Sequence, residues 1–476
     1  MFFGREKDVA ELMGLWNKRV SSFVTCRGRR RIGKSTLIEK FAEESGATFI
    51  ELVGLKPAKA FSNATELSAF AEQLARQTGC DDTPPSSWMR AFTRLDREIR
   101  DTGRTVVLLD EISWMAHYDA AFAETLKIAW DTLFKKHDGL VFVVCGSVST
   151  WIRDNLIDSG SFFGRRSLDV VVDELPLREC VKFWGDRASR IDAREIIDIL
   201  SVTGGVPRYL EEIDPSLGAN ENIRRLAFSP HGILREDFDE MFDDVITKLP
   251  ALSGRLLRCL TGEAKSVSEL VEMLGISRGG TVSDVLHCLI EAGLVKRDAG
   301  RNPETGDAVK EARYRLKDNY ARFYLKYIEP VKDVIDEGAY DLASLADMPG
   351  WDAVLGLAFE NLVVNNYREV IPHLHLDGAQ IISAAPYCRR KSGTHPGCQV
   401  DLLLQCRRAL HFIEIKRQNE IGRDVIDQVD EQVRRVSRPA GVSARTALVY
   451  EGHLSRVAQT DGYFDAIVPF QKLLGL

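Results

Sequence analysis

A glycine-bounded loop near the N-terminus constrains the fold more than any other feature of the sequence. Residues 28–36 read GRRRIGKST, which is a complete GxxxxGK[ST] pattern. A short β-rich run, 22–26, precedes the loop, and 36–42 follows with the spacing of a helix. Small glycines let backbone N–H groups turn inward around an anion, and the N-terminus of the following helix adds partial positive charge. The pattern therefore predicts a phosphate-binding loop between a strand and a helix.

Positions within such a loop have distinct chemical roles. The ammonium group of Lys34 reaches the β- and γ-phosphates of a nucleoside triphosphate, and the Ser35 hydroxyl can ligate Mg²⁺. The three arginines either strengthen phosphate binding or point into solvent, and the sequence leaves both interpretations open. We therefore expect ATP and Mg²⁺ as cofactors. The loop residues expected to bind the nucleotide are Gly28, Arg29, Arg30, Arg31, Ile32, Gly33, Lys34, Ser35 and Thr36.

Two carboxylates follow an apolar run further along the chain. Residues 105–109 read TVVLL, which is typical of a strand buried on both faces, and Asp110 and Glu111 come directly after it. The carboxyl ends of parallel strands line the crevice where α/β sheets bind ligands. Asp110 can then hold Mg²⁺ through water, and Glu111 can polarise the attacking water. A strand that simply ends in a charged turn is the alternative.

Length and composition limit what the rest of the chain can be. A chain of 476 residues is too long for one hydrophobic core and should divide into domains. A net charge of −7 excludes a generally basic surface, so nucleic-acid binding would need a local patch. The sequence has no apolar run of membrane-spanning length and no signal-peptide core at its start. We therefore expect a cytoplasmic protein that does not contact a membrane.

The nine cysteines show no CxxC spacing, which predicts free and mostly buried thiols. A zinc site is the alternative. Its ligands would be Cys388, His395, Cys398 and Cys406, although these spacings are unlike those of structural zinc loops.

Three further segments match a known family. The strand-like run 140–147 ends in Ser147, residues 162–166 read FFGRR, and 203–209 reads TGGVPRY. Together with the loop and the carboxylate pair, they resemble the AAA+ ATPases over roughly residues 1–330. The resemblance is to the archaeal-type branch, close to the STAND switch ATPases and the replication-initiator ATPases. It implies a P-loop ATPase core followed by a helical lid.

This resemblance also implies roles for single residues. Ser147 occupies the sensor position beside the γ-phosphate, Pro207 touches the base, and Arg208 faces the phosphates. Arg165 or Arg166 takes the place of an arginine finger that completes a neighbouring subunit's site, which implies a homo-oligomer. The alternatives are a strand cap for Ser147 and solvated side chains for the two arginines.

The spacing of apolar residues changes after residue 249. It predicts short helices over 251–261, 266–274 and 281–292, followed by a hairpin of 293–297 and 312–316. Three helices and a hairpin form the winged-helix plan. The third helix carries Asp284, His287 and Glu291, so its surface is close to neutral or acidic. This favours a structural or nucleotide-gated arm over sequence-specific DNA recognition.

Near the C-terminus, two strand-like runs flank a turn centred between Arg407 and Arg408. This turn places Asp401 directly across from Glu414, with Cβ atoms about 5 Å apart, where like charges are destabilising. A Mg²⁺ ion would remove that repulsion. Period two puts Lys416 on the same face as Glu414, where a lysine can assist a metal-bound water or stabilise developing phosphate charge.

These residues resemble the DxnExK core of the PD-(D/E)xK nuclease superfamily, which has a restriction-endonuclease-like fold. The resemblance implies Asp401, Glu414 and Lys416 as catalytic residues, with Asp401 and Glu414 as metal ligands. It also implies Glu360, on the helix expected over 351–370, as a further ligand, and more weakly Gln428. Val400 stands where the motif has Pro, and some members of the superfamily have lost cleavage. Between residues 387 and 417, seven Lys/Arg and two acids form a basic strip that suits a phosphodiester backbone.

The sequence thus predicts an α/β protein with four parts: a P-loop AAA+ ATPase core (1–175), a helical lid (176–245), a winged-helix domain (246–333) and a restriction-endonuclease-like α/β domain (334–476). We expect an ATP-hydrolysing switch that controls a Mg²⁺-dependent nuclease acting on nucleic acid, with DNA as the preferred target. One alternative is a signalling or regulatory ATPase whose C-terminal domain binds nucleic acid or protein without cleavage. The other is an initiator-like DNA loader.

Overall fold

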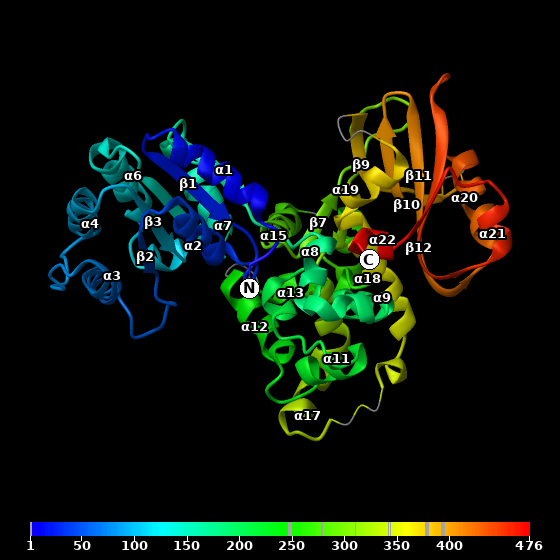
Figure 1. Cartoon of the computed structure of the whole chain (residues 1–476), viewed down its shortest axis with the longest axis horizontal. Coiled ribbons are helices and arrows are strands. Elements are labelled where there is room, and N and C mark those ends of the chain that lie inside the picture. Colours follow the sequence, from blue (N-terminus) through cyan, green and yellow to red (C-terminus); the bar gives the residue numbers. More distant parts are fainter. Residues whose placement is uncertain are drawn as a thin grey trace. The chain divides into compact units, whose positions relative to one another are not determined.

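A computed structural model describes residues 2–147, 149–245, 250–277, 279–309, 311–340, 342, 344–376, 380–391 and 396–476. The chain divides into two compact units. The first comprises Met1–Asp173 with Glu291–Gly293, and the second comprises Glu174–Ile290 with Leu294–Leu476. Figure 1 shows the sheet of the first unit in blue to cyan and the C-terminal sheet of the second unit in yellow to red. Within the described part, no helix has the length and apolarity needed to cross a membrane.

A parallel five-stranded sheet in the order β2-β3-β4-β1-β5 forms the centre of the first unit. Strands β3 and β4 are buried along their whole length, as their continuous apolar sequences predict. Because all five strands run in the same direction, their carboxyl ends meet at one edge. This confirms the predicted α/β P-loop sheet. Its strands are β1 (Ser22–Arg27), β2 (Thr48–Val53), β3 (Thr105–Asp110), β4 (Val141–Gly146) and β5 (Arg166–Val171).

Helices cover this sheet, and aromatic rings fill much of the space between them. Phe23 stacks on Phe142 with ring centroids 5.9 Å apart, and Trp88 meets the edge of Phe122 at 4.7 Å. Aromatic pairs in these geometries add to the free energy of apolar burial. The helices are α1 (Glu6–Asn17), α2 (Lys34–Ser45), α3 (Asn63–Thr78), α4 (Trp88–Thr102), α5 (Ile112–Met115), α6 (Phe122–Thr132) and α7 (Ser149–Ile152).

The second unit begins with helices around the buried Tyr320, whose hydroxyl donates to the carbonyl oxygen of Leu234 at 2.7 Å. Helix α9 packs against α11, α16 and α18, so it joins the start of this unit to its C-terminal part. The helices are α8 (Leu177–Val181), α9 (Ala193–Thr203), α10 (Pro207–Leu210), α11 (Ala219–Ala227), α12 (Ile233–Val245), α16 (Asn319–Phe323) and α17 (Lys332–Asp336).

The elements between residues 250 and 316 follow the predicted order of three helices and a hairpin. A short strand, β6, adds to the hairpin and gives an antiparallel sheet in the order β6-β8-β7. Ser266 begins the second helix with a capping box, because its hydroxyl accepts from the Glu269 amide while the Glu269 carboxylate accepts from the Ser266 amide. The elements are α13 (Pro250–Cys259), β6 (Lys265–Ser266), α14 (Val267–Leu274), α15 (Gly280–Glu291), β7 (Val295–Asp298) and β8 (Arg313–Leu316).

A mixed five-stranded sheet in the order β13-β12-β11-β10-β9 closes the chain. Strands β10 and β11 form an antiparallel hairpin, whereas β11, β12 and β13 run parallel. Helix α20 packs on the face that carries Leu410, Phe412 and Glu414. The elements are α18 (Trp351–Asn365), α19 (Tyr367–Val370), β9 (Ile381–Arg389), β10 (Cys398–Cys406), β11 (Ala409–Ile421), α20 (Asp424–Arg435), β12 (Ser443–Leu454), α21 (Arg456–Thr460), β13 (Ala466–Pro469) and α22 (Gln471–Leu474).

The single helix predicted over 351–370 is wrong, because the chain forms two helices there. Helix α18 ends at Asn365, and Asn366 caps it with a side-chain bond to the carbonyl oxygen of Leu362 at 2.9 Å. Asparagine side chains compete with the helix for backbone hydrogen bonds and so favour helix ends. The apolar spacing continues through the break, which is why periodicity did not detect it. The four-part division of the chain stays a prediction.

Candidate functional site

Two glycines allow the backbone of the N-terminal loop to close. Gly28 has φ 154°, and a Cβ atom there would lie 2.2 Å from the carbonyl oxygen of Val172. Gly33 has φ 88° and precedes α2 in a left-handed conformation, which is costly for other residues. The helix then begins at Lys34, so its free N–H groups face the loop. Residues 28–36 therefore form the phosphate-binding geometry that the sequence predicts.

Lys34 crosses this loop. Its side chain is buried, and its ammonium group donates to the carbonyl oxygens of Gly28 at 3.1 Å and Arg29 at 3.0 Å. These bonds hold the ammonium group inside the loop, where phosphate oxygens are the stronger acceptors for it.

Arg5 has a role that the sequence does not predict. It donates to the carbonyl oxygens of Asp173 at 2.6 Å and Ile32 at 3.2 Å, so it ties the N-terminal segment to the loop. No sequence signal identifies this role, because both acceptors are backbone atoms.

Ser35 and Asp110 meet although they lie 75 residues apart in sequence. The Ser35 hydroxyl donates to Asp110 Oδ2 at 2.5 Å, and Asp110 Oδ1 accepts from the amide of Glu111 at 2.9 Å. The hydroxyl and carboxylate predicted to hold Mg²⁺ thus lie side by side at the carboxyl edge of the sheet. Oxygen donors of this kind are those that Mg²⁺ prefers.

Glu111 adopts an unusual backbone conformation directly after β3. Its φ is 49°, in the left-handed region, and its carboxylate accepts from the Ser147 hydroxyl at 2.9 and 3.1 Å and from the Ser147 amide at 3.3 Å. Burial raises the pKa of Glu111, while Lys34 lowers it and Asp110 raises it. Non-glycine residues in this conformation concentrate at functional sites, because the surrounding structure must maintain the strain. Ser147 therefore orients the carboxylate that the sequence assigned to the attacking water.

The two candidate finger arginines differ in their surroundings. Arg165 makes a bidentate ion pair with Asp131 on α6, with N–O distances of 2.8 to 3.1 Å. Arg166 begins strand β5, where it is in register with Phe23. An arginine finger at position 165 would therefore have to exchange Asp131 for a phosphate of the neighbouring subunit.

Pro207 and Arg208 lie in the second unit. Pro207 is the first residue of α10, and Arg208 pairs with Glu212 at 2.6 Å and Glu211 at 3.8 Å, both directly after the end of this helix. Their roles towards base and phosphates stay predictions.

The C-terminal hairpin has the register that the sequence predicts. Leu402 pairs with Ile413 and Leu403 with Phe412, so the next positions along the hairpin are Asp401 and Glu414. The pairing of β10 with β9 shifts by one residue between Val400 and Leu403, an irregularity of the bulge type in the segment that contains Asp401. Bulges are frequent next to functional sites, where they redirect a side chain.

Glu414 is completely buried and held from three sides. Its Oε1 accepts from Gln428 at 2.8 Å and pairs with the Lys416 ammonium at 2.7 Å, and its Oε2 accepts from Gln432 at 2.9 Å. Burial lowers the pKa of Lys416, but the neighbouring carboxylates, Glu414 first, produce a net increase. Gln432, one helical turn beyond Gln428, is a second residue that the sequence analysis missed.

Asp401 faces a concentration of negative charge. Its Oδ2 accepts from the amide of Ile415 at 2.9 Å, yet burial and the carboxylates of Glu414 and Glu360 raise its pKa well above the ordinary value. Glu360, on α18, is half-buried, and burial raises its pKa against the opposing effect of Arg315 and Arg322. The structure therefore brings all three predicted carboxylates and Lys416 into one electrostatic cluster.

This cluster is not a preformed metal site. Among the described residues, no group of three or more His, Cys, Asp or Glu side chains is arranged to hold a metal ion. At Glu414, Lys416 and two glutamines contact the carboxylate oxygens. For the alternative zinc site, His395 lies outside the described residues, and all nine cysteines are free thiols.

The comparisons with known proteins cover nearly all of the first unit and the start of the second. Residues 2–213 match the model of a family described as an ATPase domain predominantly from Archaea. This part of the chain is an ATPase domain of that family. A solved structure, the Walker-type ATPase of Pyrococcus abyssi, shares the fold at 15% identity with a TM-score of 0.50, covering 68% of this chain and 96% of that chain.

Two further proteins are similar over most of the chain. An uncharacterized protein of Methanocaldococcus jannaschii is 22% identical over 438 residues, which is 89% of each chain. The ORC2 protein of Aeropyrum pernix, solved in ADPNP and ADP complexes, matches at 16% identity with a TM-score of 0.45, over 70% of this chain and 94% of that chain. The match to the archaeal ATPase family supports ATP binding by the domain. The nuclease resemblance rests on the geometry of the hairpin alone.

Proposed function

We propose that this archaeal-type ATPase is a switch that controls a metal-dependent nuclease formed by its C-terminal sheet. The observation that carries the proposal is the position of Asp401 across from Glu414, with Lys416 paired to Glu414. Like charges on opposite strands destabilise a hairpin unless another group compensates them. Here three carboxylates share one lysine, and the pKa of Asp401 is raised first by burial and then by the charges of Glu414 and Glu360.

The donor set suits Mg²⁺, because it consists of carboxylate oxygens. Asp401 and Glu414 would hold the ion, with Glu360 as a third carboxylate. A bound ion would polarise the phosphodiester and lower the pKa of a water. Gln428 and Gln432 fix the orientation of Glu414, and Lys416 supplies a positive charge for the phosphate oxygens as negative charge develops on them.

The positive charge around the hairpin supports binding of nucleic acid by this domain, and we propose DNA as the target. Its turn exposes Arg407 and Arg408 to solvent. Basic side chains in such positions attract the phosphate backbone in a salt-dependent way.

An ion-pair network supports control of this domain by the ATPase. Arg417, next to Lys416 on β11, pairs with Asp198 on α9 at 2.5 Å and with Glu451 at 3.4 Å. Helix α9 continues at its other end into the segment with Pro207 and Arg208. A movement of this segment would therefore reach the strand that carries Glu414 and Lys416.

A cleavage assay tests both parts of the proposal. Labelled DNA is incubated with Mg²⁺, with and without ATP, using wild type, Lys34→Ala, Asp401→Asn and the exposed control Glu420→Gln on the neighbouring strand β11. We expect Asp401→Asn to abolish cleavage, Lys34→Ala to remove its ATP dependence, and Glu420→Gln to leave it unchanged. Wild-type protein that never cleaves DNA would exclude the nuclease.

The second candidate function is a regulatory ATPase whose C-terminal domain binds without cleaving. The contacts of Lys416, Gln428 and Gln432 with Glu414 favour it, since they stabilise the carboxylate without a metal. Nucleic-acid binding that survives the triple change of Asp401, Glu414 and Lys416 to alanine, with no cleavage by wild type, would select this function.

We further propose that the protein assembles into a homo-oligomer in which Arg165 or Arg166 completes a neighbouring ATP site. Light scattering with and without ATP tests the assembly. A monomer under both conditions would exclude it.

A further inference from the structure

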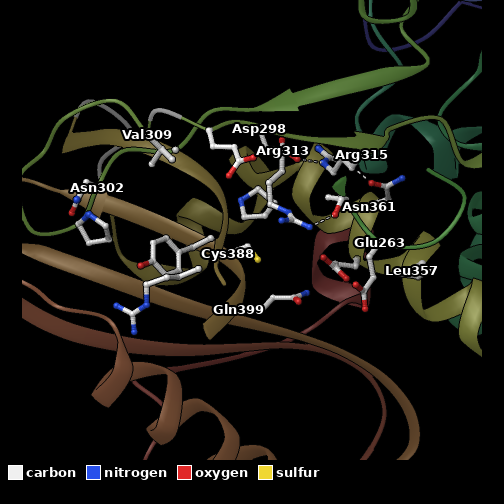
Figure 2. A pocket seen from close by; sticks show the side chains of 18 of the residues that line it. Glu263, Asp298, Asn302, Val309, Arg313, Arg315, Leu357, Asn361, Cys388 and Gln399 are labelled. Carbon is white, nitrogen blue, oxygen red and sulfur yellow. Dashed lines mark hydrogen bonds and ion pairs between the residues drawn. The ribbon is translucent and has the colours of Figure 1, made fainter. Parts of the chain in front are cut away.

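A pocket of about 420 Å³ in the second unit opens beside the acidic cluster. Its walls come from the β7–β8 hairpin and its connecting loop, from α18, and from β9 and β10. Figure 2 shows Asp298 and Arg313 on one side, Cys388 and Gln399 on the opposite side, and Leu357 at one end. A volume of this size is typical of small-molecule sites and can accept a single planar ring system with its attached sugar.

Ion pairs and hydrogen bonds fix the hairpin wall of this pocket. Arg315 pairs with Asp298 at 2.8 Å and donates to Asn365 at 2.8 Å and to Asn361, so it joins β7 and β8 to α18. Arg322 is buried, with a pKa lowered by burial to about 10, and it donates to the carbonyl oxygens of Leu316 and Gly262. Preorganised walls reduce the entropy that a ligand must lose on binding.

The chemistry of the lining suits a nucleobase. Tyr387 supplies an aromatic side chain, on which a base can stack. The exposed amide of Gln399, on the neighbouring strand, can donate to and accept from the edge of a base. The Nε atom of Arg322 is a further buried donor, and it has no hydrogen-bond partner in the part of the chain that the structure describes.

Glu360 links the pocket to the acidic cluster. It lines the pocket, and its charge interacts with Asp401, Glu414 and Lys416. A base held in the pocket would therefore bring its strand close to this cluster. A base inside a duplex cannot enter, since it would first have to leave its stack and its partner.

We propose that this pocket binds one unpaired nucleobase of a nucleic-acid strand, so that the acidic cluster acts on single strands, flaps or frayed ends rather than on intact duplex. The inference rests on the proposed nuclease function for its substrate, but base binding itself can be measured without cleavage.

The test measures binding of fluorescent DNA by anisotropy, using the full chain in the Asp401→Asn background with ATP and Mg²⁺. The probes are a blunt duplex, the same duplex with a short single-stranded overhang, and the overhang strand alone. We expect tighter binding of the two probes with unpaired bases. Tyr387→Ala and Gln399→Ala should weaken that binding, the first by about tenfold, which is the scale of one lost stacking contact.

Two control variants separate base binding from folding. Tyr387→Phe keeps the aromatic ring and should bind like the background protein. Ile382→Ala changes an exposed residue of β9 outside the pocket and should also have no effect. Equal binding of blunt and overhang probes, or unchanged binding in both Tyr387→Ala and Gln399→Ala, would overturn the proposal.

Competition with free mononucleotides distinguishes the two sources of a base. Displacement of the overhang probe by a mononucleotide at similar concentration would mean that the pocket serves a free nucleotide, and it would overturn strand recognition. Overhang binding that depends on Tyr387, in a protein whose wild type never cleaves DNA, would exclude the nuclease and leave the base pocket in place.

Discussion

The phosphate-binding loop and the acidic hairpin both place a lysine beside carboxylates, but they do so by different means. At the loop, backbone conformation makes the site: Gly28 and Gly33 have positive φ, and Glu111 is left-handed. At the hairpin, side chains make it: Lys416, Gln428 and Gln432 surround Glu414. The geometry of a site made of backbone groups is determined by a short sequence pattern. The geometry of a site made of side chains depends on which strands and helices pack together.

The largest expected effect tests the carboxylate of the backbone-built site. Glu111→Gln keeps the size of the side chain and its hydrogen bond to Ser147 but removes the group that accepts a proton. We expect ATP hydrolysis to fall by about 10² to 10⁴ fold while ATP binding persists. Steady-state turnover and nucleotide titration measure the two quantities, with Glu44→Gln on the exposed face of α2 as the control. Unchanged turnover would remove Glu111 from catalysis.

The second prediction concerns the backbone itself. Gly28→Ala puts a Cβ atom 2.2 Å from the carbonyl oxygen of Val172, so the loop must shift. We expect loss of nucleotide binding and a decrease of about 1 to 3 kcal/mol in the free energy of unfolding. Denaturant unfolding and nucleotide titration measure these effects. Gly160→Ala, where a Cβ atom meets nothing within 4 Å, is the matched control.

The third prediction uses the charge at the side-chain-built site. The pKa of Asp401 is raised in the folded protein, so without metal the folded state holds its proton more tightly than the unfolded state. Stability from this group is present below its unfolded pKa and is lost as the pH rises through the folded pKa. Asp401→Asn should therefore unfold a few degrees higher than wild type at neutral pH without metal, and the difference should shrink at acidic pH.

Added Mg²⁺ sharpens this third prediction. It should raise the unfolding temperature of wild type, because binding to the folded state stabilises it, and should leave Asp401→Asn unchanged. Thermal unfolding followed by circular dichroism at several pH values is the measurement. An Asn variant that is less stable than wild type at every pH would show that Asp401 is compensated by other groups.

The smallest expected effect concerns the link between α9 and β11. A double-mutant cycle with Asp198→Asn and Arg417→Gln should give a coupling free energy of about 0.5 to 3 kcal/mol, since the two groups form a partly buried ion pair. The same variants should weaken the ATP dependence of the C-terminal domain without changing ATP hydrolysis. If the cycle gives a coupling free energy but the variants keep the ATP dependence, the contact contributes to stability and does not transmit the ATP state.

Much of the first unit could be predicted because its signals are local. The GxxxxGK[ST] pattern and the apolar strand before Asp110 each lie within a few residues, and backbone sterics and burial decide their structure. The hairpin register was also predictable, because the turn at Arg407 and Arg408 fixes which residues pair. The break after Asn365 was missed because the apolar spacing does not stop there.

The contacts that define the acidic cluster could not be read from sequence in the same way. The bonds from Gln428 and Gln432 to Glu414, and the charge of Arg315 and Arg322 near Glu360, join segments far apart in the chain. No short pattern records such meetings, since they depend on how helices pack on the sheet.

The sequence by itself therefore determined the phosphate-binding loop, the buried strands beside it and the facing of Asp401 and Glu414, since backbone geometry and strand periodicity act over short distances. Only the tertiary structure decided that Ser147 holds Glu111, that Arg165 pairs with Asp131, and that a pocket opens next to Glu360. The physical reason is that side-chain contacts between distant segments depend on packing, which many different sequences can achieve.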